Sequence, residues 1–260
     1  MKNNGIIILV VLISFGILAN NIKAAEEEPQ ISWCLDSSVV SKYMWRGYDL
    51  YDDHGAWQPS IDMDLFDSGF GVNVWGSFAL SSGFELAEEL DYTLYYCFSL
   101  FEEEQYAVDF YFNYIYFDYI HTSSDADVYE SGGEVSLPNL LKIGDLAIVP
   151  SYYVGHDSMA QSGTGINSGW FHILGLSWDM PLKCPVREVE QLFSFNTEVV
   201  FNDGAYEADH DWSHAVAGLS TTFEISNWSI TPSVYYQLSM DDSVNDEDEL
   251  WAGISFSCSF

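Results

Sequence analysis

Apolar and polar residues alternate strictly over the last eleven residues of the chain, Leu250 to Phe260. One set of alternate positions carries leucine, alanine, isoleucine, phenylalanine and cysteine, and the other carries serine, one glycine and Trp251. Successive side chains of a strand point to opposite sides, so this period-two pattern predicts a strand with one apolar and one polar face. Such a strand suits a membrane β-barrel, although a half-buried strand of a soluble sandwich has the same pattern.

The rest of the chain favours the barrel, because the alternation recurs in segments that turn-forming or acidic residues separate. The twelve segments are 33–46, 57–66, 70–80, 90–100, 105–119, 128–137, 145–154, 169–180, 190–202, 213–225, 228–239 and 249–260. Several have about the 9–11 residues of a tilted membrane strand. An even strand number places both chain ends on one side of a closed barrel. The predicted fold is all-β: one transmembrane, up-and-down antiparallel β-barrel of about twelve strands.

The N-terminal segment has the features of a secretory signal peptide. Lys2 precedes an apolar run of fifteen residues from Gly5 to Ala19, and Ala24 precedes an acidic stretch. The run is shorter than the roughly 18–20 residues of a spanning helix. We therefore expect residues 1–24 to be a signal peptide and residues 25–260 to form the barrel domain, exported through the periplasm to the outer membrane of a Gram-negative bacterium.

The charged composition limits the classes of partner that the protein can bind. The chain has 7 Lys and Arg against 40 Asp and Glu, a net charge of −33. Such acidity repels nucleic acid and anionic ligands and attracts cations. The expected partners are therefore outer-membrane lipid and lipopolysaccharide on the outside and small solutes or cations in the lumen, with no nucleic acid. The oligomeric state stays open.

Strand parity assigns a set of charged side chains to the barrel interior. The predicted pore-lining residues are Lys42, Arg46, Asp62, Asp64, Asp91, Asp109, Glu198 and Glu224. Unpaired buried carboxylates are costly, so either water fills the lumen or Arg46 pairs with them. The first alternative predicts a cation-preferring diffusion pore with a constriction near Arg46. The second predicts a closed lumen in which an Arg–carboxylate network only holds the strands together.

Within the first third of the chain, the segment from Ser41 to Gly47, Ser-Lys-Tyr-Met-Trp-Arg-Gly, resembles the Ser-x-Tyr-x-x-Arg-Gly first strand of the TorF-like porin family. The segments Gln58-Pro-Ser60, Gly69-Phe70 with Trp75-Gly-Ser77, and Glu89-Leu-Asp-Tyr92 are similar to the next three strands of that family. The resemblance covers about residues 38–96 and implies an outer-membrane barrel with porin activity. The four cysteines depart from the family pattern.

The densest group of candidate metal ligands lies in one predicted loop and comprises Asp209, His210, Asp211 and His214. Oxygen-rich loops suit Ca²⁺ or Mg²⁺, and histidine adds affinity for transition metals; a solvated acidic loop is the plainer alternative. No resident cofactor is expected. The competing functional prediction is a structural or binding barrel that does not conduct and whose outer loops bind divalent ions. An enzyme is not predicted, because no nucleophile motif is recognisable.

The first and last predicted strands each carry a cysteine, Cys34 and Cys258, and a closed barrel makes these strands neighbours. Strand parity places Cys34 inward and Cys258 outward. A disulfide between them is therefore disfavoured, because a bridge needs side chains that point toward each other.

Overall fold

The computed structural model describes residues 31–124, 126–143, 146–160, 167–183 and 190–260. The predicted signal peptide, residues 1–24, and Cys184 lie outside these ranges. The described chain is mostly β-structure, with two single-turn 3₁₀ helices, η1 (Glu85–Ala87) and η2 (Ala205–Glu207). No helix in the described ranges has the length and apolarity for a membrane crossing.

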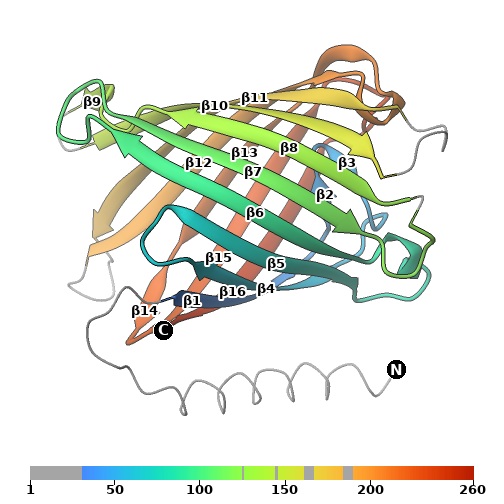
Figure 1. Cartoon of the computed structure of the whole chain (residues 1–260), viewed down its shortest axis with the longest axis horizontal. Coiled ribbons are helices and arrows are strands. Elements are labelled where there is room, and N and C mark those ends of the chain that lie inside the picture. The colour runs from blue at the N-terminus through green and yellow to red at the C-terminus, as the bar shows by residue number, and fades with distance from the viewer. Residues whose placement is uncertain (1–30, 125, 144–145, 161–166, 184–189) are drawn as a thin grey trace.

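Twelve long strands form the wall of a closed barrel (Figure 1). They are β1 (Ser32–Val40), β4 (Ala56–Asp64), β5 (Phe70–Ala79), β6 (Glu89–Leu100), β7 (Val108–Asp118), β8 (Val128–Ser136), β10 (Leu146–Met159), β11 (Gly169–Lys183), β12 (Glu190–Asp203), β13 (His210–Thr221), β15 (Trp228–Ser239) and β16 (Glu249–Ser259). Each pairs antiparallel with its sequence neighbours, and β1 pairs with β16 from Cys34↔Ser259 to Val40↔Gly253. Closure leaves the wall without a free edge, as a lipid environment requires. The predicted fold class is confirmed.

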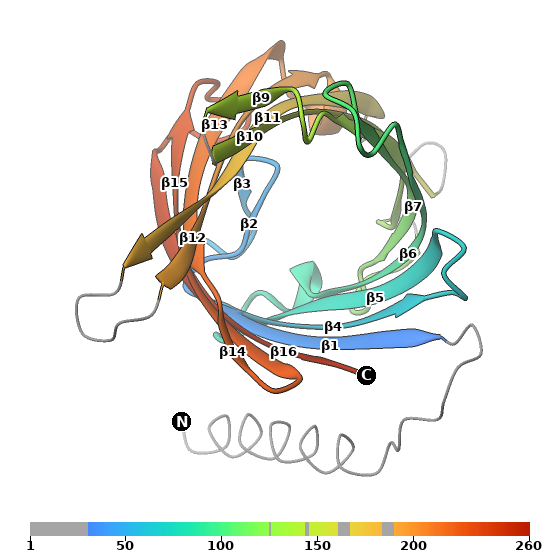
Figure 2. The same ribbon diagram turned by 90° about the vertical axis from the view of Figure 1, so that its left-hand side faces the viewer.

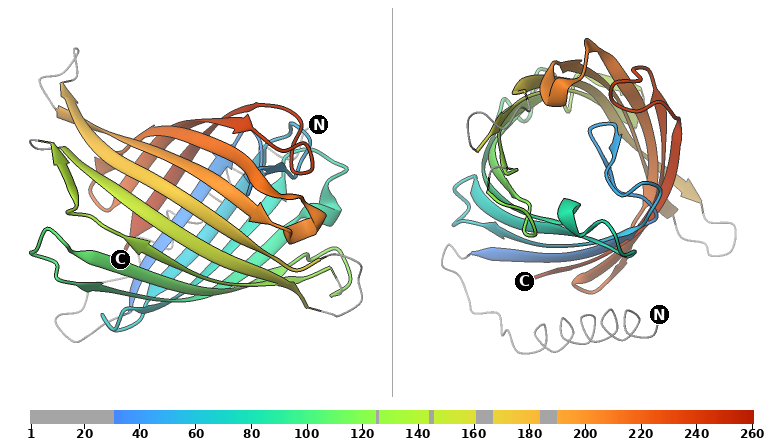
Figure 3. Two further views of the ribbon diagram at one scale, coloured as in Figure 1. Left: turned by 90° about the horizontal axis from the view of Figure 1, so that it is seen from above. Right: turned by 90° about the vertical axis from the view of Figure 1, so that its right-hand side faces the viewer.

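The connections sort into two ends of the barrel (Figures 1 and 3). One end, the long-loop end, is where β1, β5, β7, β10, β12 and β15 end; its described connecting residues are 41–55, 80–88, 119–124, 126–127, 160, 167–168, 204–209 and 240–248. The other, the short-turn end, carries the remaining connections, with the short strands β9 (Leu141–Ile143) and β14 (Phe223–Ile225). The start of β1 and the end of β16 both lie at the short-turn end, as an even strand number requires.

The two faces of the wall differ as the alternation predicts. On β6, Tyr92 and Leu94 are 43% and 51% exposed on the outer face, whereas Asp91, on the opposite face, is 8% exposed. Large apolar side chains are exposed in the same way on other strands, among them Phe112, Leu174, Leu176, Val234, Leu238 and Ile254. An apolar outer band around a polar interior is the arrangement of transmembrane barrels.

The prediction of one strand over 33–46 is wrong. Strand β1 ends at Val40, and the chain turns into a hairpin of β2 (Met44–Trp45) and β3 (Tyr48–Asp49). The two residues at its turn, Arg46 and Gly47, have φ of 50° and 95°. Positive φ at both central residues is the geometry of a type I′ hairpin turn, which a continuing strand excludes. Lys42 and Arg46 therefore lie on this connection and not on the first strand.

Other predicted boundaries shift as well. The segment 213–225 is interrupted at Thr222, which separates β13 from β14, and β10 continues to Met159 where the prediction ended at residue 154. Pro59, Pro150 and Pro232 stay inside strands despite the ladder hydrogen bond that each removes.

The cysteines of the first and last strands lie as parity predicts. Cys34 pairs across the sheet with Ser259, and Cys258 pairs with Leu35, so the two thiols are on opposite faces. Both are free thiols.

Candidate functional site

The connection between β1 and β4 folds into the barrel interior. Figures 2 and 3 show β2 and β3 projecting from the wall into the ring of strands, and we name residues 41–50 the inward hairpin. Its aromatic side chains contact different parts of the wall. The ring of Tyr43 lies 5.8 Å from that of Trp75 on β5, while Trp45 lies 5.8 Å from Phe117 on β7 and 5.9 Å from Phe171 on β11. The hairpin therefore spans between walls of the lumen.

Two polar contacts fix the hairpin to the β13–β16 side of the wall. The carbonyl of Gly47 accepts hydrogen bonds from Gln237 Nε2 at 2.9 Å and Asn245 Nδ2 at 3.3 Å. A Cβ at Gly47 would lie 2.6 Å from His214 Nδ1, so the backbone approaches this wall as closely as glycine allows. Both the close approach and the positive φ require a residue without a side chain here.

At the base of the hairpin, the Lys42 ammonium forms ion pairs with Asp53 and Glu249. The hydrogen bond from Lys42 holds the pKa of the Asp53 carboxyl below its ordinary value of 3.8. Burial alone would lower the pKa of Lys42, but its hydrogen bonds to the two carboxylates outweigh burial and raise it. The pair with Glu249 joins the hairpin to the last strand of the wall.

At the tip, Arg46 is held by charge and by aromatic faces. Its Nη2 lies 2.6 Å from Glu130 Oε2 on β8, and the Glu130 side chain is fully buried. The guanidinium carbon lies 4.9 Å from the ring centroid of Phe171 and 5.0 Å from that of Tyr153. Tyr153 also donates its hydroxyl to Glu130. This combination of a charged hydrogen bond and cation–π contacts holds the guanidinium in one position.

Further carboxylates surround the same level of the lumen. Asp157 on β10 is fully buried next to Glu130 in the β-ladder, and it accepts a hydrogen bond from Tyr206 at 2.8 Å. Glu89 on β6 accepts one from the Tyr43 hydroxyl. Arg46 has one guanidinium charge, and so it cannot neutralise all the carboxylates at this level.

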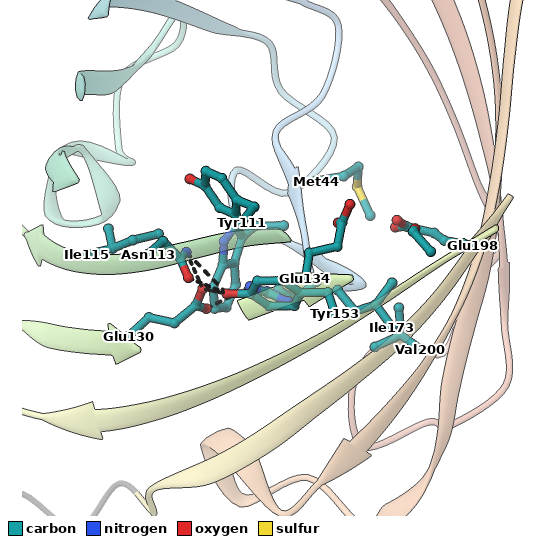
Figure 4. A pocket seen from close by; sticks show the side chains of 14 residues that line it. Met44, Tyr111, Asn113, Ile115, Glu130, Glu134, Tyr153, Ile173, Glu198 and Val200 are labelled. Carbon is teal, nitrogen blue, oxygen red and sulfur yellow. Dashed lines mark hydrogen bonds and ion pairs between the residues drawn. The ribbon is translucent and has the colours of Figure 1, made fainter. Parts of the chain in front are cut away.

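Three cavities surround the tip of the hairpin, and Met44 and Arg46 line all of them. Their volumes are about 420, 290 and 140 Å³. Figure 4 shows the first, where Glu134, Glu198, Tyr111 and Asn113 lie around the space beside Met44. The space on either side of the hairpin is therefore lined by acidic and aromatic side chains.

The structure brings together only part of the predicted pore-lining set. Arg46, Asp91 and Glu198 lie on cavities around the hairpin tip. Asp62 and Asp64 form a separate group toward the short-turn end, where the Tyr95 hydroxyl is 2.8 Å from a carboxylate oxygen of each.

The other two predicted acids lie apart from these groups. Asp109 is opposite Ser99 and Ser136 in the sheet, near the short-turn end. Glu224 is exposed on β14.

The four predicted metal ligands do not converge on one point. His214 is buried below Gly47, with its Nδ1 2.9 Å from Ser213 Oγ, whereas His210 is exposed and pairs with Asp203 at 2.5 Å. The described residues do hold one group of three carboxylates whose oxygens lie within 4.8 Å of one another. It consists of Asp49, Asp53 and Glu249. Two of these three carboxylates form ion pairs with the Lys42 ammonium, so a side-chain cation of the protein already compensates part of their charge.

Sequence reasoning missed three central residues of the lumen. Glu130 lies on the segment 128–137, whose two glycines weaken the alternation. Asp157 lies beyond the predicted end of its strand, and Trp45 lies in the misassigned continuation of the first strand. Gly47 was the available signal, because a glycine at the end of an alternating run favours a turn with positive φ.

These features define a class of protein: a closed, antiparallel transmembrane-type β-barrel with an apolar outer band and a polar interior that an inward hairpin narrows. The structure is similar to that of the NanC porin, with a TM-score of 0.53 and 11% sequence identity over 86% of this chain and 98% of that one. It is also similar to the KdgM porin, with a TM-score of 0.51 and 11% identity over 87% and 99% of the two chains. Identity this low shows a shared fold alone. No protein-family model and no curated protein matches the sequence, so the resemblance to the TorF-like family is not confirmed.

Proposed function

We propose that this protein is an outer-membrane channel for passive diffusion of small solutes, with a preference for cations. The observation that carries the proposal is the acidic, cavity-lined interior around the inward hairpin. The exposed apolar outer face supports a location in lipid, and the porin folds of the two similar structures support a channel. The long-loop end would face the outside of the cell and the short-turn end the periplasm.

The preference for cations follows from the charge of the lumen. Glu89, Asp91, Glu130, Asp157 and Glu198 all lie at or near the level of Arg46. A cleft lined by one sign of charge within low-dielectric walls raises the local concentration of the opposite ion. Anions would therefore be depleted at the narrowest level of the lumen.

A non-conducting structural or binding barrel is the second candidate. The observation that favours it is the firm packing of the inward hairpin. Its tip pairs with the fully buried carboxylate of Glu130, and the rings of Tyr43 and Trp45 contact opposite walls. In this case the Arg–carboxylate network would hold the barrel closed. The expected binding of Ca²⁺ or Mg²⁺ at the outer loops belongs to this candidate. Isothermal titration calorimetry with each ion tests this binding, and the absence of heat would exclude the ion binding.

Single-channel recording of the purified protein in a planar bilayer, with a salt gradient across it, separates the candidates. We expect discrete openings and a cation-selective reversal potential. Asp62→Asn and Glu198→Asn should each reduce the selectivity, because each removes one luminal charge. Glu103→Gln, in the exposed residues 101–106 of a short turn, is the matched control and should leave the selectivity unchanged. Insertion without conduction would overturn the channel.

A further inference from the structure

One cavity beside the inward hairpin has an unusual lining. The space of about 290 Å³ is bounded by Tyr43, Trp45, Trp75 and Phe117 together with the carboxylate of Asp91, as well as by residues of the hairpin tip. Its volume is close to the lower end of the roughly 300–1,000 Å³ of small-molecule sites. Gln58, Arg46 and Glu130 also line it. Aromatic faces with a few convergent polar groups are the composition of a ligand site.

Asp91 is the acceptor of this lining that lacks a partner among the described residues. It is 8% exposed, and its Oδ1 is buried without a hydrogen bond from any residue that the structure describes. Arg46 Nη1 is also buried without a described partner, but the guanidinium is already paired with Glu130 through Nη2. Buried carboxylate oxygens are normally satisfied, because leaving one unpaired costs the full desolvation of the group. An unsatisfied oxygen on a cavity wall indicates that a donor from outside the chain completes the site.

The neighbouring charged side chains already have partners within the protein, which leaves the Asp91 carboxylate free to bind a ligand. Glu89 accepts the Tyr43 hydroxyl, and Arg46 is turned to Glu130 at 2.6 Å and to the ring of Phe171 at 4.9 Å. The Arg46 charge is therefore compensated by a carboxylate other than Asp91. The field at the Asp91 carboxylate stays negative, and it favours a cation in the cavity.

The aromatic walls indicate which cation. The rings of Tyr43 and Trp75 lie 5.8 Å apart, and so do those of Trp45 and Phe117, so two aromatic pairs border the cavity. A hydrated metal ion needs several oxygen ligands, and this lining offers few. An organic ammonium instead gains from aromatic faces through cation–π attraction and from burial of its alkyl part.

We propose that this cavity binds a primary alkylammonium ion. Its N–H groups donate to Asp91 Oδ1, and its alkyl chain packs between the two aromatic pairs. A quaternary ammonium has the same charge but no N–H donor, and it cannot satisfy the carboxylate oxygen. The site therefore selects by hydrogen bonding as well as by charge.

Equilibrium titration of the purified barrel in detergent with propylammonium chloride tests the site, with tryptophan fluorescence and calorimetry as readouts. We expect saturable binding that Asp91→Asn weakens by about tenfold or more, the effect of losing one charge-assisted hydrogen bond. Asp109→Asn is the matched control, because it removes one luminal carboxylate away from this cavity and should leave the affinity unchanged. Asp91 has no described partner to lose, so we expect the variant to fold.

Comparison of ligands on the unaltered protein gives a second readout. Tetramethylammonium and propanol should both bind at least about tenfold more weakly than propylammonium, because the first lacks the donor and the second lacks the charge. Equal binding of the two ammonium ions, equal loss in both Asn variants, or no saturable binding would each overturn the proposal. None of these measurements requires that the protein conducts ions, so the proposed binding site and the proposed channel function are tested independently of each other.

Discussion

Replacing Arg46 by methionine tests whether the inward hairpin is held by its buried ion pair. Methionine keeps most of the length and apolar surface of the arginine side chain but removes the charge and the donors to Glu130. The variant therefore leaves a carboxylate with a fully buried side chain without its cation.

The magnitude follows from that burial. Breaking a buried ion pair by removing one partner costs about 3–5 kcal/mol, whereas an exposed pair contributes about 0–1 kcal/mol. Glu130 keeps the hydroxyl of Tyr153 and a long contact of 3.4 Å from Asn113. We therefore expect a loss near the lower limit, about 3 kcal/mol in the free energy of unfolding.

Urea titration in detergent micelles, followed by tryptophan fluorescence, measures this loss by linear extrapolation. Lys142→Met is the matched control, because Lys142 is exposed on β9 and should change stability by less than about 0.5 kcal/mol. The double variant Arg46→Met/Glu130→Gln should recover about 1–3 kcal/mol of the expected additive loss. An Arg46→Met loss no larger than that of the control, or strict additivity in the double variant, would refute the reasoning.

Two further predictions concern the base and the turn of the inward hairpin. Gly47→Ala should lower the free energy of unfolding by about 1–3 kcal/mol, since its Cβ would lie 2.6 Å from His214 Nδ1 at a φ of 95°. Gly83→Ala also has positive φ but nothing within 4 Å, so it should cost less in the same urea titration, and equal costs would contradict the close approach. The pKa of Asp53 is lower in the folded protein than in the unfolded chain. Its contact with Lys42 therefore stabilises the fold at pH values above the ordinary pKa, and this stabilisation is lost as the pH falls through the lowered pKa of the folded protein. The natural protein should therefore lose more stability than Lys42→Met between roughly pH 5 and pH 3, and parallel losses would show that this contact contributes nothing.

The amino-acid sequence by itself determined most of the barrel. The alternation of apolar and polar residues is a local property, and a strand converts it directly into two faces. It predicted the twelve strands of the wall, the pairing of the first with the last, and the opposite facing of Cys34 and Cys258. It also placed Asp91 and Glu198 inside, because one residue of slip would have moved each strand's apolar set inward.

The same alternation misled where a tertiary contact decides the path of the chain. Tyr43 and Trp45 alternate with Lys42, Met44 and Arg46 as in a strand, yet the chain leaves the wall at Val40. Local periodicity cannot tell an outer face that meets lipid from an aromatic face that packs across a lumen, since both are apolar.

Only the folded structure decided which groups meet at the hairpin tip. Arg46 comes from the inward hairpin, Glu130 from β8 and Asp157 from β10, and they lie far apart in the sequence. How far the hairpin reaches into the barrel decides that Glu130 is the partner of Arg46. It also decides that Asp91 has no partner among the described residues. That reach is set by the close approach of Gly47 to the wall and by aromatic contacts on facing strands, which are long-range properties that no local pattern records.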